Sequence, residues 1–389
     1  MKKFAMLFLL FIPTWLMAQS ADELLEKGKN AERLALNRRA TEYYLQATQA
    51  APEQANAWLC LGMLLQRLSH YSEAIPALAK AATLADSAAD SVAALANEHL
   101  AECYVDDGDF DGAKNGGIGD SSDLIGIVER AIELNPQSAS AHASMALILN
   151  HQRQFMPALS WVKKAVELGG NNPRAYNAYG IVLYNQGRDN DAIKQFKMAL
   201  KTDPDNDDAF YNLGVMHALR GNHETALKYL REGLKQNPNS VKLYYFMGVA
   251  NLDRGNAEQA IKCYEHIIQN LDSTYTPAYN KLGAIYWKKG DFDRAVGYHN
   301  QAVKINPKDA ESYKCLGKVY VDKGDFVKAT RNYQKAVLNN PRDHETYLLM
   351  AKLYAAQGNE GREASSYKKA AKLGNAEAQA WMVKRGKKW

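Results

Sequence analysis

Apolar residues along most of the chain follow a helical spacing, and the whole pattern returns every 34 residues. Gly180, Gly214 and Gly248 are separated by this step, and Gly283 and Gly317 are separated by it again. A second series of glycines runs in step with the first, except for one step of 35 residues: Gly187, Gly221, Gly255, Gly290, Gly324 and Gly358. The pattern predicts consecutive pairs of short antiparallel helices.

Within each unit, the residue types at fixed positions resemble the tetratricopeptide repeat. The unit that begins at 310 matches throughout, with Tyr313, Leu316, Gly317, Tyr320, Ala329, Tyr333, Ala336 and Pro341. In this register repeats begin near 21, 55, 94, 139, 173, 207, 241, 276, 310 and 344. The resemblance implies an all-α fold, a right-handed superhelical solenoid of about ten helix-turn-helix repeats, because one hairpin cannot bury its apolar face alone.

Small residues are expected where the two helices of a hairpin cross. In the repeat that begins at 310 they are Gly317 and Ala329, where a side chain larger than methyl would push the helices apart. Gly324 is expected to end the first helix in a left-handed conformation. Large residues beside the crossing are predicted to fill the core.

The first 18 residues have the features of a signal peptide. Lys2 and Lys3 precede an apolar run from 4 to 17, which is shorter than the roughly 20 residues that span a bilayer. Cleavage after Ala18 would leave Gln19 as the first residue of the mature chain, and a frame ending at Ser20 is the alternative. The chain is therefore expected to be exported, to the periplasm first and to the cell surface or medium second, with no transmembrane segment in its mature form.

The remaining chain divides into four parts in this register. Repeats one and two occupy 19–88, and repeat three, lengthened by a Gly- and Asp-rich insertion, occupies 89–138. Repeats four to ten occupy 139–374, and a capping helix with a basic tail is expected over 375–389.

One segment of the insertion resembles the start of a calcium-binding loop. Asp107 to Gly112 reads D-x-D-x-D-G, but Ile118 stands where such a loop needs a bidentate Glu. A plain turn between helices is the favoured interpretation, and cation binding stays open as the alternative. His99 and Cys103 have ligand spacing on one helix but lack a third ligand, so no metal is predicted.

No catalytic motif is present, so the chain is predicted not to be an enzyme and to need no cofactor. The four cysteines are Cys60, Cys103, Cys263 and Cys315. They are interpreted as packed free thiols, with a Cys60–Cys103 disulfide as the alternative. The net charge of +5 over 389 residues gives no electrostatic indication of a nucleic-acid partner.

The family resemblance implies a concave inner face lined by the first helix of each repeat, at positions 2, 5, 9 and 12. Aromatic rings there would supply contact area, asparagines would pair with a bound backbone, and lysines would attract carboxylates. The alternative is that the aromatic rings shield the neighbouring repeat. The predicted partner-binding groove comprises Asn177, Tyr184, Tyr211, Tyr245, Asn280, Trp287, Lys314 and Lys318.

The inner face of the first repeats differs in charge, because Asp22, Glu32, Glu98 and Glu102 outweigh Lys29. The expected function is a scaffold or adaptor that binds a protein or extended peptide in its groove, in cell-envelope assembly or secretion. Two alternatives are a surface-exposed or released protein that contacts host molecules and an accessory subunit of an envelope enzyme.

Overall fold

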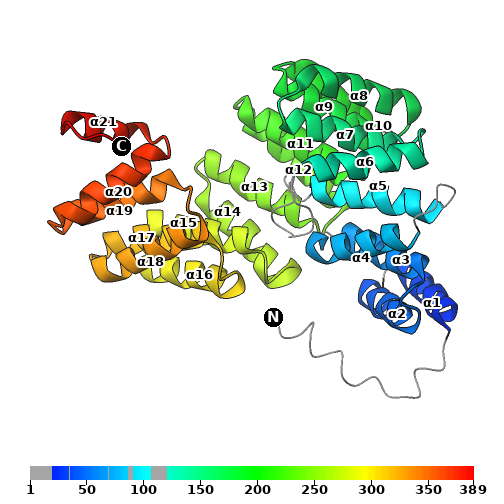
Figure 1. The fold of residues 1–389 in the computed structure, drawn as a ribbon, viewed down its shortest axis with the longest axis horizontal. Helices are drawn as coiled ribbons and strands as arrows, with labels where there is room; N and C mark the ends of the chain where they lie inside the picture. The colour runs from blue at the N-terminus through cyan, green and yellow to red at the C-terminus, as the bar shows by residue number, and fades with distance from the viewer. Residues whose placement is uncertain (1–19, 35, 69, 86–90, 107–120) are drawn as a thin grey trace. The chain divides into compact units, whose positions relative to one another are not determined.

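A computed structural model describes residues 20–34, 36–68, 70–85, 91–106 and 121–389, and these residues form helices joined by short turns (Figure 1). The signal-peptide prediction and the Asp107–Gly112 segment lie outside the described residues. By its internal contacts the chain divides into one unit over 1–216 and another over 217–389, with the boundary inside α11 (Asp207–Leu219). The predicted all-α fold is confirmed by the helices of the described residues.

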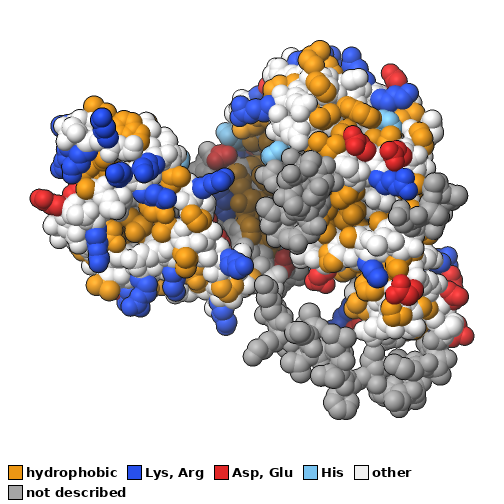
Figure 2. Space-filling view, in the orientation of Figure 1, with side chains coloured by type: hydrophobic (Ala, Val, Ile, Leu, Met, Phe, Trp, Pro, Cys, Tyr) orange, Lys and Arg blue, Asp and Glu red, His pale blue; other side chains and the backbone are white. Residues whose placement is uncertain are grey.

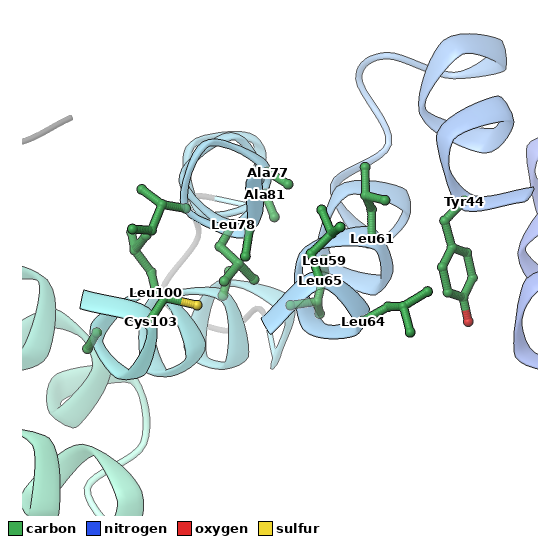
Figure 3. Packing of buried hydrophobic residues seen from close by; sticks show 14 of the residues in the cluster. Tyr44, Leu59, Leu61, Leu64, Leu65, Ala77, Leu78, Ala81, Leu100 and Cys103 are labelled. Carbon is green, nitrogen blue, oxygen red and sulfur yellow. The ribbon is translucent and has the colours of Figure 1, made fainter. Parts of the chain in front are cut away.

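The first unit consists of helical hairpins. Its helices are α1 (Ala21–Arg33), α2 (Asn37–Ala50), α3 (Ala55–Arg67), α4 (Tyr71–Leu84), α5 (Ser91–Asp106), α6 (Ser121–Leu134), α7 (Ala139–His151), α8 (Phe155–Leu168), α9 (Pro173–Asn185) and α10 (Asp189–Thr202). α5 begins at 91, before the expected start near 94, and Ala93 and Ala96 near its start are buried. Over the first repeats the core is a cluster in which Tyr44, Leu64, Leu78 and their neighbours pack between successive helices (Figure 3). A second cluster, which includes Ala158, Val162 and Val182, lies between α7, α8 and α9.

The second unit repeats the same arrangement. Its helices are α12 (His223–Gln236), α13 (Val241–Asp253), α14 (Ala257–His266), η2 (Ile267–Leu271), α15 (Thr276–Lys288), α16 (Phe292–Ile305), α17 (Ala310–Asp322), α18 (Phe326–Asn339), α19 (His344–Ala356), α20 (Glu360–Lys372) and α21 (Ala376–Lys384). The π-helix η2 lies in the repeat whose glycine step is 35 residues. A π-turn takes up one residue more than an α-turn, so it accommodates the extra residue without changing the register of the next repeat.

The glycine predicted at each helix crossing faces the large residue of the second helix. A Cβ built on Gly62 would lie 2.5 Å from Cγ of Leu78, and one built on Gly180 would lie 2.4 Å from Cε1 of Phe196. The predicted small-residue crossing is therefore confirmed for glycine, but its partner is the bulky residue of the second helix. The first helix has glycine at this position because the bulky residue of the second helix fills the space that a side chain would need.

In the repeats from 139 onward, whose turns the structure describes, a residue in the left-handed conformation ends the first helix. Gly324 has φ of +74°, as expected, and the other glycines of the second series also have positive φ. In the repeat that begins at 139 the same place is taken by Arg153, with φ of 61°. Among described residues it is the one non-glycine residue with positive φ, which identifies a strained turn.

The C-terminal helix α21 packs on the last hairpin. Trp381 stacks on Tyr367 with ring centroids 4.1 Å apart, and Arg385 covers the other side of the indole at 4.1 Å. Ala378 and Met382 are buried in the same cluster. These contacts shield the apolar end of the array from water.

Candidate functional site

A pocket of about 480 Å³ lies on the first-helix side of the N-terminal repeats. It is lined by residues of α1, α2, α3 and α5: Lys29, Glu32, Tyr44, Cys60, Met63, Gln66, Arg67, His99, Glu102 and Asp106. Lys29 and Met63 stand at position 9 of their repeats, and Glu32 and Gln66 stand at position 12. These are two of the register positions expected to face a ligand.

On one side of the pocket, Glu32 connects side chains from two other helices. Its carboxylate accepts a hydrogen bond of 2.6 Å from the Tyr44 hydroxyl and forms an ion pair with Arg67. Burial and the hydrogen bond to Glu32 both raise the pKa of Tyr44. The phenol therefore stays protonated and keeps donating, which links α1, α2 and α3 on this wall.

The opposite side is organised by Glu102 on α5. Gln66 donates to Glu102 at 2.9 Å, His99 bonds the same carboxylate at 3.1 Å, and Nε of Arg174 lies 3.4 Å from it. Burial alone would raise the pKa of Glu102, but Arg174 and the hydrogen bonds from His99 and Gln66 lower it to about 2. The carboxylate is therefore charged at neutral pH although it is buried.

Arg174 connects α9 to two acidic residues of α5, Glu102 and Asp106. Its guanidinium donates to Asp106 at 2.9 Å and 3.2 Å and is also paired with Glu102. Burial and the neighbouring Glu102 raise the pKa of Asp106 despite this contact. In His99, burial lowers the pKa, but the bond and charge of Glu102 outweigh it, so the pKa is raised. The wall is thus a network with charges of both signs.

The eight residues predicted to form the groove are not part of this pocket. Three of them, Asn177, Tyr184 and Tyr211, belong to the first unit, and the other five belong to the second. Asn177 and Lys314 are buried, Asn280, Tyr245 and Trp287 are half-buried, and Tyr184 is exposed. Their assignment to a ligand groove therefore stays a prediction.

Position 5 has a structural partner that sequence analysis did not identify, the residue at the start of the next repeat. Asn177 donates to Asn206 at 2.8 Å, and Asn280 donates to Asp309 at 3.0 Å. The ring of Tyr245 meets Tyr275 edge-on at 5.7 Å.

Lys314, also at position 5, lies 3.5 Å from Asp343 and 3.2 Å from Glu345. Position 5 therefore couples each of these repeats to the N-terminal turn of its successor. The sequence contained a signal for this coupling. Where position 5 is polar, the residue that precedes the next repeat is polar, and where position 5 is Tyr245, that residue is Tyr275.

Two further predicted groove residues also contact the next repeat. The indole of Trp287 donates to Asp322 at 2.6 Å, and Lys318 donates to Glu345 at 3.0 Å. The lysines are thus neutralised by the protein's own carboxylates. This arrangement weakens the expectation that this face attracts an acidic peptide.

The described residues give no sign of metal chemistry or of a membrane span. No three His, Cys, Asp or Glu side chains within them gather as a metal site would require. No helix in the described ranges combines the length and apolar character needed to cross a bilayer. Cys60, Cys103, Cys263 and Cys315 are free thiols.

Family models match most of the repeat array. A model described as "TPR repeat" matches 180–221, and models described as "Tetratricopeptide repeat" match 61–113, 207–240, 241–269, 276–309 and 316–378. A search of curated protein sequences gave no match.

Several solved structures are similar in fold. Yeast Tom70 covers 94% of this chain and 94% of its own, with 14% identity and a TM-score of 0.55. A tetratricopeptide repeat protein from Parabacteroides merdae covers 64% of this chain and 98% of its own, with 21% identity and a TM-score of 0.48. PilW, described as a type IV pilus biogenesis factor, covers 54% and 98%, with 18% identity and a TM-score of 0.47. The matched repeats and the observed hairpins agree, and the chain belongs to the tetratricopeptide repeat family.

Proposed function

We propose that this protein is an exported scaffold or adaptor that holds a protein or an extended peptide on the inner face of its repeats. The observation that supports this most directly is the pocket between α1, α3 and α5, because three successive repeats contribute their inward positions to it. A partner that crosses several repeats would gain contacts from each of them. No catalytic role is proposed.

The chemistry of the pocket suits a main chain with an apolar side chain. Lys29, Gln66 and Arg67 have more N–H groups than their contacts with Glu26, Glu102 and Glu32 use, so donors remain for a ligand. Met63, which is 37% exposed, offers an apolar contact. A peptide carries a carbonyl acceptor at each residue, so these donors can pair with its main chain. Tyr184, which is 38% exposed, is the predicted groove residue with the most accessible ring among those described.

The proposed site of action is the cell envelope, in assembly or secretion. The basic and apolar N-terminal residues support export. The alternatives are a released or surface protein that contacts host molecules and a subunit that assists an envelope enzyme. Cell fractionation separates the envelope scaffold from the released protein, since recovery of the protein mainly from the medium would contradict the envelope scaffold.

Site-specific photo-crosslinking in intact cells tests the binding surface. A photoreactive amino acid at Met63 should give a discrete crosslinked product with a partner protein. Leu45 is the matched control, because it is an exposed apolar residue of α2 at 43% and does not line the pocket. Equal products from both positions, or none from Met63, would contradict the proposal.

A further inference from the structure

The second unit carries a regular array of basic side chains on its second helices. Positions 19, 22, 26 and 29 of α16, α18 and α20 lie on one side of each helix, because they follow the i, i+3, i+7, i+10 spacing. These twelve positions contain eight Lys or Arg residues and no Asp or Glu. The outer basic stripe is defined here as Arg294, Lys304, Lys328, Arg331, Lys335, Arg362, Lys369 and Lys372.

Contacts repeated between hairpins indicate that equivalent members of the stripe point the same way. Arg294 lies over Tyr286, Lys328 over Tyr320 and Arg362 over Tyr354, at 5.1, 5.3 and 5.7 Å from the ring centroids.

A second set of contacts repeats in the same manner. Lys335 lies over Tyr313 and Lys369 over Tyr347, at 5.1 and 5.9 Å. The basic residues of the stripe are therefore placed alike in each hairpin that these contacts describe.

Most of the stripe's charge is not neutralised by the protein. Arg294 pairs with Asp291, and Lys328 pairs with Asp325. The other six members are exposed and form no ion pair with a described residue. Residues 217–389 contain 29 Lys and Arg against 17 Asp and Glu, whereas residues 1–216 contain 19 against 26. Figure 2 shows basic side chains spread over the visible face of the second unit, with few acidic ones.

Exposed apolar side chains accompany the charges. Leu338 occupies position 29 of α18, within the array, and is 78% exposed. Val327, beside Lys328, is 72% exposed. Aliphatic groups gain nothing from a phosphate backbone in water, but they are favourable among lipid headgroups and acyl chains. The combination favours a bilayer surface over a nucleic acid.

We propose that the outer basic stripe docks the second unit on the surface of an anionic lipid bilayer. Clusters of Lys and Arg bind anionic headgroups, and nearby apolar side chains anchor the contact. This site lies on the second helices, whereas the pocket of the proposed function is lined mainly by first helices of the other unit. The two inferences are therefore independent.

Vesicle flotation tests the proposal with a chain that starts at Gln19. This chain retains α1–α21 and lacks the apolar N-terminal run, which could itself enter a bilayer. The protein should float with phosphatidylcholine vesicles that contain phosphatidylglycerol, but not with pure phosphatidylcholine, and added salt should release it. Equal binding to the neutral vesicles would overturn the proposal.

Removing four unpaired charges should abolish the interaction. The combined variant Arg331→Gln, Lys335→Gln, Lys369→Gln and Lys372→Gln should bind at least ~100-fold more weakly, because each basic residue near the surface contributes about a fivefold factor. A control with the same charge change in the first unit should bind like the parent: Lys27→Gln, Lys163→Gln, Lys197→Gln and Lys201→Gln, all exposed residues. Equal losses in both variants would mean that net charge, not the stripe, is responsible.

A single apolar substitution distinguishes lipid from other polyanions. Leu338→Gln should weaken vesicle binding, whereas Met156→Gln, at a residue 73% exposed in the first unit, should not. Circular dichroism checks that each variant keeps its helices. If Leu338→Gln has no effect, or if the stripe instead retains a DNA oligonucleotide or a second copy of the chain, the lipid assignment is wrong.

Discussion

Gly317 on α17 faces the ring of Tyr333 on α18 so closely that a Cβ on the glycine would lie 2.3 Å from Cε1 of the tyrosine. Tyr333 is 1% exposed and belongs to the core shared with the next hairpin. The ring of Tyr333 therefore fills the space that a side chain at Gly317 would take. This relation recurs at Gly28 with Tyr44 and at Gly248 with Tyr264, and it sets the distance between the two helices of a hairpin.

Gly317→Ala should lower the stability of the second unit by about 1–3 kcal/mol, because the methyl group forces Tyr333 out of its position. Gly297→Ala is the matched control, since Gly297 lies within α16 and a Cβ there meets nothing within 4 Å. The control should be neutral or slightly stabilising, because alanine is the better helix former. Urea denaturation followed by circular dichroism measures both, and equal midpoints would contradict the packing account.

Arg153→Gly should stabilise the first unit by about 1 kcal/mol. The arginine has φ of 61° at a position where other repeats have glycine, and this conformation raises the free energy of a residue that has a Cβ. The reverse test is Gly187→Ala, where φ is +74° and a Cβ meets nothing within 4 Å. That variant should lose stability through backbone strain alone. Thermal unfolding measures whether Arg153→Gly gains stability and Gly187→Ala loses it. A loss of stability in Arg153→Gly would contradict the prediction.

Acid should weaken the pocket network through Glu102. Its pKa is about 2 in the folded protein and 4.5 ordinarily, so its stabilising contribution is complete above 4.5 and is lost as the pH falls from 4.5 toward 2. Glu102→Gln should lack this component of the pH dependence. Asp106, whose pKa is raised, acts in the opposite direction, so the comparison between parent and variant is the informative measurement.

The pKa of His99 gives a second measure of the contact between His99 and Glu102. Glu102 raises its pKa against the effect of burial, so protonated His99 stabilises the fold below pH 6.5, and this contribution disappears as the pH rises through the raised pKa. In Glu102→Gln the pKa of His99 should fall. A histidine titration by NMR measures it, and an unchanged pKa would show that Glu102 does not control the imidazole.

Lys314→Met should destabilise the junction between the last two full repeats more than Lys318→Met. Lys314 is 8% exposed and lies among the carboxylates of Glu311, Asp343 and Glu345. Its removal leaves these three negative charges close together without their shared cation, at a cost of about 1 kcal/mol. Lys318 shares Glu345 but is more exposed, so its loss should cost less. Equal denaturation midpoints for the two variants would contradict a coupling role for position 5.

The repeat architecture could be predicted from the sequence because its signals are local. The spacing of Gly317, Gly324 and Pro341 specifies the hairpin, its turn and its end, and each depends on a steric rule that acts within one or two helices. Where the sequence departs from the pattern, the local signals no longer specify the backbone. The 35-residue step was visible, but its accommodation by the π-helix η2 depends on how the backbone relaxes.

Contacts between repeats decide which side chains remain available for a ligand. The sequence by itself determined the helical hairpins and the register of the repeats. Only the tertiary structure decided that Asn280 and Lys314 bond to the next repeat and that Arg174 reaches Glu102 and Asp106. It also decided that six cations of the outer basic stripe have no carboxylate partner among the described residues. The physical reason is that a charged or polar side chain is free for a ligand only if no neighbouring group satisfies it, and the packed structure determines those neighbours.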